Sequence, residues 1–163
     1  MGALDLHKDD VKAWADGKLA KQGLPLPKMP SNKDPEFEYP EDPSRLGSIE
    51  IGQWMSKFTG FFNYTTRLLG NVEAELVLVE AEYRLRVNTL RPEVIEDMPS
   101  RPAADVVESE VLRRHDELTP LYERRLQLLS VQKSLEARAK IYERGYQAMS
   151  RELSRRELEG RVQ

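Results

Sequence analysis

The clearest pattern in the sequence is the spacing of apolar residues between positions 48 and 91. This stretch contains no proline, and its apolar residues recur in steps of three and four. That spacing places them on one face, so the stretch predicts a long amphipathic helix. Ser48 is a suitable N-cap, and we expect the helix to end at Arg91 because Pro92 disfavours helical backbone in the residue before it.

A connector follows this first helix. Residues 92–102 contain three prolines and predict a turn-rich segment, and the helical pattern resumes at Ala103. Pro120 either starts the last helix, with Thr119 as its N-cap, or kinks a longer one.

The last helix carries a heptad repeat. Its two seams are positions 118, 125, 132, 139, 146 and 153, and positions 121, 128, 135, 142 and 149. Arg125 and Gln132 place polar side chains in the first seam, which is typical of a mixed interface or of a polar layer that sets the register.

These patterns together predict an all-α protein, built as an elongated helical hairpin with arms like those of a coiled coil. A straight helix of 44 residues would be about 66 Å long, well beyond the radius of a compact chain of this size. We divide the chain into an arm, residues 1–47, and a helical domain for oligomerisation and binding, residues 48–163.

The arm is marked by its prolines. Six of the ten prolines in the chain lie between Pro25 and Pro43, where no helix can persist, so an irregular segment is expected there. A short helix is possible over residues 4–20. Trp14 is a lone tryptophan in this polar stretch and is a candidate anchor for docking a partner.

An elongated hairpin shields few side chains by itself, so its aromatic residues predict self-association into a homo-oligomeric ring or bundle. Core or subunit packing explains their helical spacing better than a base-stacking platform does. The predicted oligomerisation residues are Trp54, Phe58, Phe61, Phe62, Leu128, Leu135, Tyr142 and Met149.

Composition argues against several classes of chemistry. The chain has no cysteine and only two histidines, which argues against a metal site. Phosphate-binding glycine loops and hydrolase motifs are missing, and His115 beside Asp116 lacks a nucleophile, so we expect neither an enzyme nor a cofactor. Charged residues throughout the N-terminus and the lack of a long apolar run predict a cytoplasmic protein without a membrane partner.

Charge is distributed unevenly along the chain. Residues 92–119 carry a formal charge of −5 and residues 120–163 carry +4. The basic residues of the last helix that could neutralise phosphates are Arg138, Lys140, Arg144, Arg151, Arg155, Arg156 and Arg161.

For most of these cations, ion pairing along the helix is the simpler interpretation. Glutamates stand four residues from several of them, as Glu152 does from Arg156 and Glu82 does from Arg86. The functional alternative is that Arg84 and Arg86, with Tyr83 alongside, face a nucleic-acid strand. The arginines would then supply charge for phosphate, and the tyrosine ring would stack on a base.

The arrangement resembles the UvsY-type recombination mediators of tailed bacteriophages over residues 48–158. The segments that carry the resemblance are QWMSK at 53–57, EAE at 73–75, EAEYRLR at 80–86 and SRELSRR at 150–156. The resemblance implies a ring-forming helical protein that binds single-stranded DNA and helps to load a recombinase. By position, Arg84 and Arg86 would inherit the DNA contact, although glutamates precede them where that family is rich in lysine.

Two hypotheses follow. In the first, the chain is a phage recombination mediator that binds single-stranded DNA through Tyr83, Arg84, Arg86 and the arginines at 151, 155 and 156, and that contacts a recombinase or a single-strand binding protein. In the second, it is a phage structural or assembly protein whose helices serve only to pack subunits. The first predicts binding to single-stranded DNA that weakens with salt, and the second predicts none.

Overall fold

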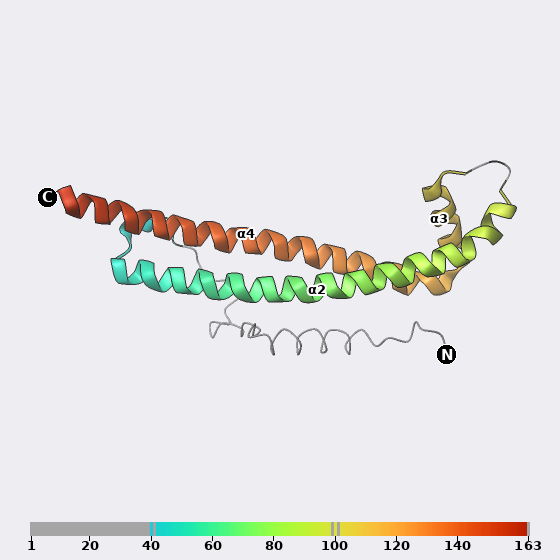
Figure 1. The fold of residues 1–163 in the computed structure, drawn as a ribbon, viewed down its shortest axis with the longest axis horizontal. Coiled ribbons are helices and arrows are strands. Elements are labelled where there is room, and N and C mark those ends of the chain that lie inside the picture. Colours follow the sequence, from blue (N-terminus) through green and yellow to red (C-terminus); the bar gives the residue numbers. More distant parts are fainter. Residues whose placement is uncertain (1–39, 41, 99, 101, 163) are drawn as a thin grey trace. The chain divides into compact units, whose positions relative to one another are not determined.

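The structure is a computed structural model that describes residues 40, 42–98, 100 and 102–162. Two short 3-10 turns, η1 (Pro43–Arg45) and η2 (Asp116–Leu118), accompany three α-helices, α2 (Ser48–Glu96), α3 (Ala104–Arg114) and α4 (Thr119–Val162) (Figure 1). The described residues include no β-strand, so the predicted all-α class is confirmed. Trp14 and most of the predicted arm lie outside the described residues.

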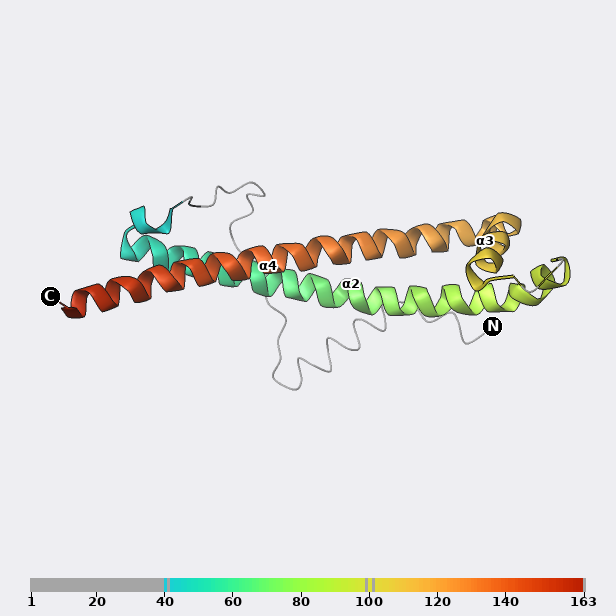
Figure 2. The same ribbon diagram turned by 90° about the horizontal axis from the view of Figure 1, so that it is seen from above.

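The described chain divides into two compact units. Unit 1 contains residues 71–132, and unit 2 contains residues up to 70 together with residues 133–162. Within each unit, part of α4 runs beside part of α2 in the opposite direction, as a helical hairpin predicts (Figure 2).

The start of α2 differs by one residue from the expected position. The carbonyl of Gly47 accepts a hydrogen bond from the Ile51 N–H at 2.9 Å, and the Gly47 N–H donates to Oε2 of Glu50 at 2.7 Å. Gly47 is therefore the N-cap and Ser48 is the first helical residue. The returning Glu50 carboxylate satisfies a backbone N–H that would otherwise lack a partner.

The predicted end of this helix at Arg91 is wrong, because α2 continues through Pro92 to Glu96. A proline inside a helix removes the hydrogen bond that its nitrogen would donate, here to the carbonyl of Asn88, and its ring crowds that carbonyl, so tertiary contacts must offset the cost. The extra turn is held by packing, since Val94 is fully buried against Val107 and Val111 of α3.

Helix α4 begins at Thr119, and Pro120 lies in its first turn. This agrees with the first of the two alternatives for Pro120, in which the proline starts the helix. Thr119 is the first helical residue rather than the N-cap, and the 3-10 turn η2 leads directly into it.

The heptad seams of α4 face α2 of the same chain. Leu118, Leu128 and Met149 are buried, while most other seam positions are half-buried. The two polar seam residues make contacts across the hairpin, since Arg125 pairs with Glu80 at 3.3 Å and Gln132 donates to Glu73 at 3.3 Å. Both contacts lie within unit 1, where they form a polar layer between the helices.

Each unit has its own apolar core. In unit 1, Tyr83, Val87 and Val94 of α2 pack with α3 and with Leu118, and a second cluster joins Leu76, Val79 and Leu128. In unit 2 the buried cluster is Ile51, Phe58 and Met149, with Trp54, Met55 and Tyr142 packed against it.

This packing changes the interpretation of the predicted oligomerisation residues. Phe58, Leu128 and Met149 are buried inside their own chain, so they offer no surface to another subunit. Trp54 and Tyr142 are half-buried in the unit 2 core, and Phe61 stacks on Tyr142 with ring centroids 5.5 Å apart. Phe62 and Leu135 are half-buried as well. Because these side chains are buried or half-buried within their own chain, they no longer argue for self-association. Self-association therefore stays a prediction.

Candidate functional site

The three residues predicted to face a nucleic-acid strand from α2 lie in different surroundings. Tyr83 is buried, with 5% of its surface exposed. Arg86 is exposed and pairs with Glu82 at 2.9 Å, as helical spacing predicts. Arg84 is exposed and makes no hydrogen bond or ion pair with any residue that the structure describes. Glu80 stands four residues before Arg84, at ion-pair spacing, but binds Arg125 instead.

The expected stacking role of Tyr83 does not fit its position. Its hydroxyl donates to Oε1 of Glu108 at 2.7 Å, and its ring lies 5.7 Å from that of Tyr122, between centroids. The guanidinium of Arg125 stands 5.6 Å from the Tyr83 ring centroid. Burial, and then the Glu108 carboxylate, raise the pKa of Tyr83 well above its ordinary value, so the hydroxyl stays protonated as a donor.

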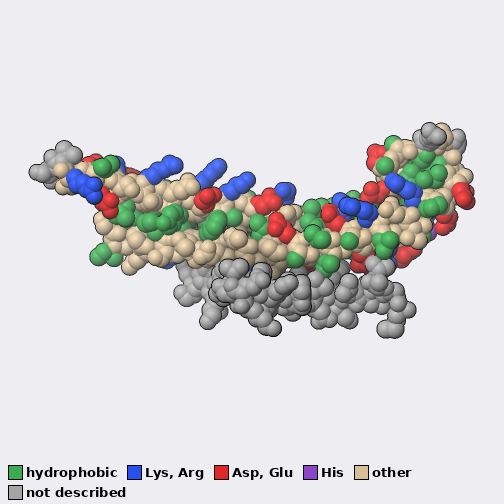
Figure 3. Space-filling model, viewed as in Figure 1, with side chains coloured by type: hydrophobic (Ala, Val, Ile, Leu, Met, Phe, Trp, Pro, Cys, Tyr) green, Lys and Arg blue, Asp and Glu red, His purple; other side chains and the backbone are tan. Residues whose placement is uncertain are grey.

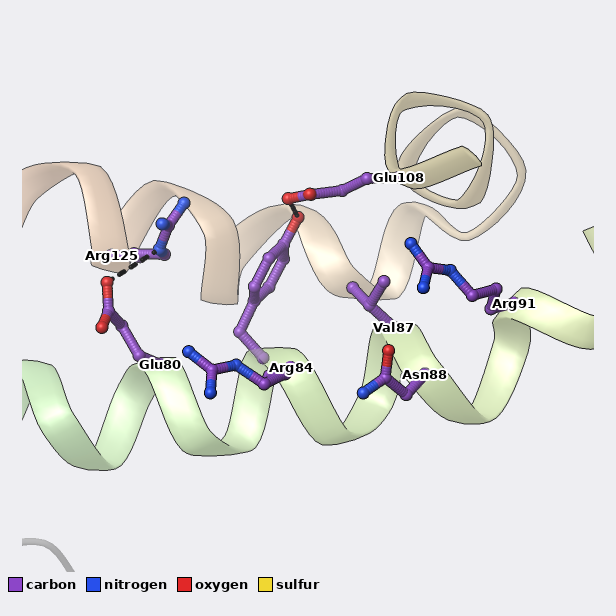
Figure 4. A pocket seen from close by; sticks show the side chains of 8 residues that line it. Glu80, Arg84, Val87, Asn88, Arg91, Glu108 and Arg125 are labelled. Carbon is purple, nitrogen blue, oxygen red and sulfur yellow. Dashed lines mark hydrogen bonds and ion pairs between the residues drawn. The ribbon is translucent and has the colours of Figure 1, made fainter. Parts of the chain in front are cut away.

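Around Tyr83, unit 1 has a pocket of about 230 Å³ on the α2 surface. Arg84, Asn88 and Arg91 project from α2, Glu108 reaches in from α3, and Arg125 comes from α4 (Figure 4). The lining residues are Glu80, Tyr83, Arg84, Val87, Asn88, Arg91, Glu108 and Arg125.

The positive charges of this pocket are not all neutralised by its carboxylates. Its two carboxylates already have partners, because Glu80 pairs with Arg125 and Glu108 accepts from Tyr83. Arg84 has no partner among the described residues, and Nε of Arg91 is buried without one. Two guanidinium groups therefore stand at the same pocket without a carboxylate.

Sequence reasoning identified Arg84 but missed the rest of this pocket. Arg84, Asn88 and Arg91 are four and three residues apart along α2, so helical periodicity alone could have placed them on one face. Glu108 and Arg125 belong to other elements, and no local signal links them to Arg84.

The predicted DNA-binding arginines near the end of α4 also divide into distinct groups. Arg155 pairs with Glu152 at 2.7 Å and also with Glu159. Hydrogen bonds from Arg155 and then from Arg156 lower the pKa of Glu152 to about 2. Arg151 is exposed and has no partner within the described part of the chain.

Arg156 has a structural role. Besides Glu152, its guanidinium donates to the carbonyls of Ser44 and Leu46 at 3.1 and 2.6 Å, and to Oγ of Ser48 at 3.3 Å. These bonds join the turn η1 and the start of α2 to the last part of α4. Most donors of this side chain are therefore occupied within unit 2, which leaves few for phosphate.

Three exposed basic residues lie close together on the outer face of α4. Lys140, Arg144 and Arg151 are exposed and make no ion pair with described residues. At 100° per residue they fall within about 40° of one another around the helix, opposite the seams. In the space-filling view, basic side chains stand in a row along the C-terminal part of α4 (Figure 3). We call these three residues the basic face of α4.

The described residues include no group of three metal-ligating side chains. His115 caps the end of α3, and its Nδ1 lies 3.2 Å from a carboxylate oxygen of Glu117. Neither nitrogen of this ring has a hydroxyl near it among the hydrogen bonds of the described chain, so the geometry assembles no nucleophile beside it. No helix in the described ranges combines the length and the apolar character needed to cross a bilayer.

Two features therefore combine exposure with unpaired positive charge, the basic face of α4 in unit 2 and the pocket at Arg84 and Arg91 in unit 1. No family model matches the chain, and no curated protein or solved structure is significantly similar to it.

Proposed function

We propose that this protein binds single-stranded DNA through the basic face of α4 and acts, as a homo-oligomer, as a phage recombination mediator that helps to load a recombinase. The observation that supports the proposal is the group of three unpaired cations at Lys140, Arg144 and Arg151. Arg86, Arg155 and Arg156 are bound by glutamates, whereas these three cations are available to phosphates.

The spacing of these cations suits a polynucleotide backbone. At 1.5 Å per residue, Lys140 and Arg144 are about 6 Å apart along the helix axis, and Arg151 is about 10 Å further on. Three phosphates neutralised on a single strand give a slope of about −2 for log affinity against log salt concentration. A ring or bundle repeats the basic face once per subunit, which multiplies a weak contact into a continuous track.

The proposal narrows the predicted set of DNA contacts. Arg151 belongs to the basic face, and Arg84 is a second exposed and unpaired cation. Arg86 and Arg155 are held in ion pairs, and Arg156 is held by its hydrogen bonds to the backbone at η1. Loading of a recombinase, contact with a single-strand binding protein and the phage origin rest on the resemblance at residues 48–158.

Fluorescence anisotropy of a labelled single-stranded oligonucleotide, at low and raised salt and beside a duplex control, tests this function. We expect preferential binding to the single strand, which weakens with salt. The triple variant K140Q/R144Q/R151Q should lose at least tenfold in affinity. The matched control R86Q/R155Q also removes two arginines but leaves the basic face intact, and it should stay within about twofold of the wild type. No binding at low salt, or an unaffected triple variant, overturns the proposal.

The alternative is a structural or assembly protein, and exposed apolar side chains favour it. Val77 of α2 and Ile141 and Leu158 of α4 are at least half exposed. Apolar residues on outer faces can contact other subunits. Sedimentation measures the oligomeric state of the purified protein. Together with the anisotropy experiment, it distinguishes the two functions. A defined oligomer without affinity for any polynucleotide would identify an assembly protein.

A further inference from the structure

We propose that the pocket lined by Arg84, Asn88 and Arg91 in unit 1 is a binding site for a phosphate group that carries two negative charges. Such a group is found in inorganic phosphate and at the end of a nucleotide. The proposal does not rest on DNA binding by the basic face of α4, because that face belongs to unit 2 and shares no residue with the pocket.

The charge of the pocket favours an anion. Three arginines and two glutamates line it, so its formal charge is +1. The Glu80 carboxylate is paired with Arg125, and the Glu108 carboxylate is occupied by the hydroxyl of Tyr83. The guanidinium groups of Arg84 and Arg91 therefore supply the uncompensated charge at this place.

Burial points to a ligand rather than to a solvated surface. Nε of Arg91 is inaccessible to solvent and has no hydrogen-bond partner. A buried donor left without an acceptor destabilises the folded state, and native proteins rarely leave one in that condition. An oxygen of a bound anion would accept this hydrogen bond and would also neutralise the charge, which a water molecule cannot do.

The donor set favours phosphate over carboxylate. Arg84 and Arg91 each present a planar fork of N–H groups, and the side-chain amide of Asn88 stands between them on the same helix face. A carboxylate has two oxygens, enough for one fork. A terminal phosphate offers three strongly accepting oxygens and more charge, so it can engage both forks when the exposed Arg84 side chain, which extends toward Glu80 in Figure 4, turns toward Arg91.

The size of the pocket sets an upper limit on the ligand. Its 230 Å³ corresponds to about seven or eight water molecules at ~30 Å³ each, which is ample room for a phosphate group. Sites for drug-sized ligands usually begin near ~300 Å³. A nucleotide would therefore place its phosphate in the pocket and leave its sugar and base outside.

Nuclear magnetic resonance of the full-length protein tests the proposal, with the Nε–Hε signal of Arg91 as the reporter. Sodium phosphate is titrated against sodium chloride at matched ionic strength. We expect a saturable shift of the Arg91 signal with phosphate and none with chloride. R84Q replaces an exposed residue and should keep the fold while it weakens phosphate binding at least tenfold. R86Q, which removes the neighbouring paired arginine, should leave the affinity unchanged.

Two further ligands distinguish the sources of the phosphate group. A deoxynucleoside 5′-monophosphate that binds at least tenfold more tightly than inorganic phosphate would identify the end of a nucleotide. Equal affinities would identify free phosphate. A dinucleotide that carries only an internal diester has one negative charge, and equally tight binding of that molecule would overturn the assignment.

The remaining outcomes are also decisive. A chloride titration that reproduces the shift, or an R84Q variant with unchanged affinity, overturns the proposal. The triple variant K140Q/R144Q/R151Q should bind phosphate like the wild type, so a failure of DNA binding leaves the result for this pocket intact.

Discussion

The ring of Phe58 in α2 packs directly against the backbone of α4 at Gly145. A Cβ atom added to Gly145 would lie 2.6 Å from two carbons of that ring, closer than real contacts allow. Phe58 is buried, with 1% of its surface exposed, so the ring cannot move into solvent. Glycine at position 145 is therefore what permits α2 and α4 to approach this closely in unit 2.

Replacement of Gly145 by alanine should destabilise the protein. Alanine favours a helix by about 1 kcal/mol over glycine, but overpacking against a buried ring costs about 1–3 kcal/mol. The difference between these effects is a net loss of up to about 2 kcal/mol in the free energy of unfolding, which urea denaturation measures.

Gly70 provides the matched control, because a Cβ there meets nothing within 4 Å. G70A should stabilise the protein by about 0.5–1 kcal/mol. The smaller side chain of F58L should reduce the effect of G145A in the double variant. A G145A protein as stable as G70A would contradict the close contact.

Arg156 binds both Glu152 and the backbone before α2, and we call this group of contacts the Arg156 clamp. It leads to a second prediction. The hydrogen bonds of Arg156 reach three backbone carbonyls before α2 and the carboxylate of Glu152, which is 9% exposed. R156Q should cost about 1–3 kcal/mol, because it leaves acceptors in partly buried positions without their donor. Hydrogen exchange at the start of α2 should accelerate at the same time.

R155Q is the control for this variant, since Arg155 is half exposed and pairs only with glutamates. Exposed ion pairs contribute little, and we expect a smaller loss than for R156Q. Equal losses for the two variants would show that the contacts to the backbone do not stabilise unit 2.

Acid should weaken the contacts of Glu152 with Arg155 and Arg156. The pKa of Glu152 is lowered from 4.5 to about 2 by hydrogen bonds from Arg155 and Arg156. A carboxylate with a lowered pKa in the folded state stabilises the protein above its unfolded pKa, and this contribution is lost as pH falls toward the folded pKa. The stabilising effect should therefore be complete above pH 4.5 and disappear near pH 2.

Thermal unfolding of wild type and E152Q across this range measures the effect. E152Q should have the lower Tm at pH 6, and the difference between the two proteins should shrink between pH 4.5 and 2. Glu110 in unit 1 has a similarly lowered pKa, so the difference between wild type and E110Q should shrink over the same pH range. A difference that is constant with pH would contradict the assignment to Glu152.

The helices could largely be predicted from the sequence, because apolar spacing and proline positions are local signals. The heptad correctly identified the faces of α4 that carry Leu128 and Met149. It could not say that these faces pair with α2 of the same chain, since a seam looks the same whether its partner is internal or a second subunit. The turn beyond Pro92 was missed because Val94 is held by α3, which is a tertiary contact.

The candidate site was less predictable for the same reason. Unpaired charge depends on where every nearby glutamate points, and Glu80 binds Arg125 of another helix rather than Arg84. Spacing also suggested a surface role for Tyr83, whereas packing against Tyr122 places it in the core. Local sequence determines which side chains share a helix face. The elements packed against that helix determine which of these side chains remain available to bind a ligand.

The hydrogen bond between Tyr83 and Glu108 connects α2 to α3 and supports a last prediction. Y83F removes a hydroxyl that is 2.7 Å from a half-buried carboxylate, which should cost about 1 kcal/mol at pH 7. E108Q retains an acceptor oxygen and should cost less. Because both changes break the same contact, Y83F should have a smaller effect in the E108Q background than in the wild type.

The sign of the pH dependence provides an independent check. The pKa of Tyr83 is raised in the folded protein above its ordinary value of 10.0, mainly by burial. A group with a raised pKa contributes fully below its unfolded pKa, and the contribution declines as pH rises above it. The stability advantage of wild type over Y83F should therefore be constant up to about pH 9 and fall above pH 10. An advantage that grows in alkali would mean that Tyr83 ionises more readily when folded, which its burial beside a carboxylate forbids.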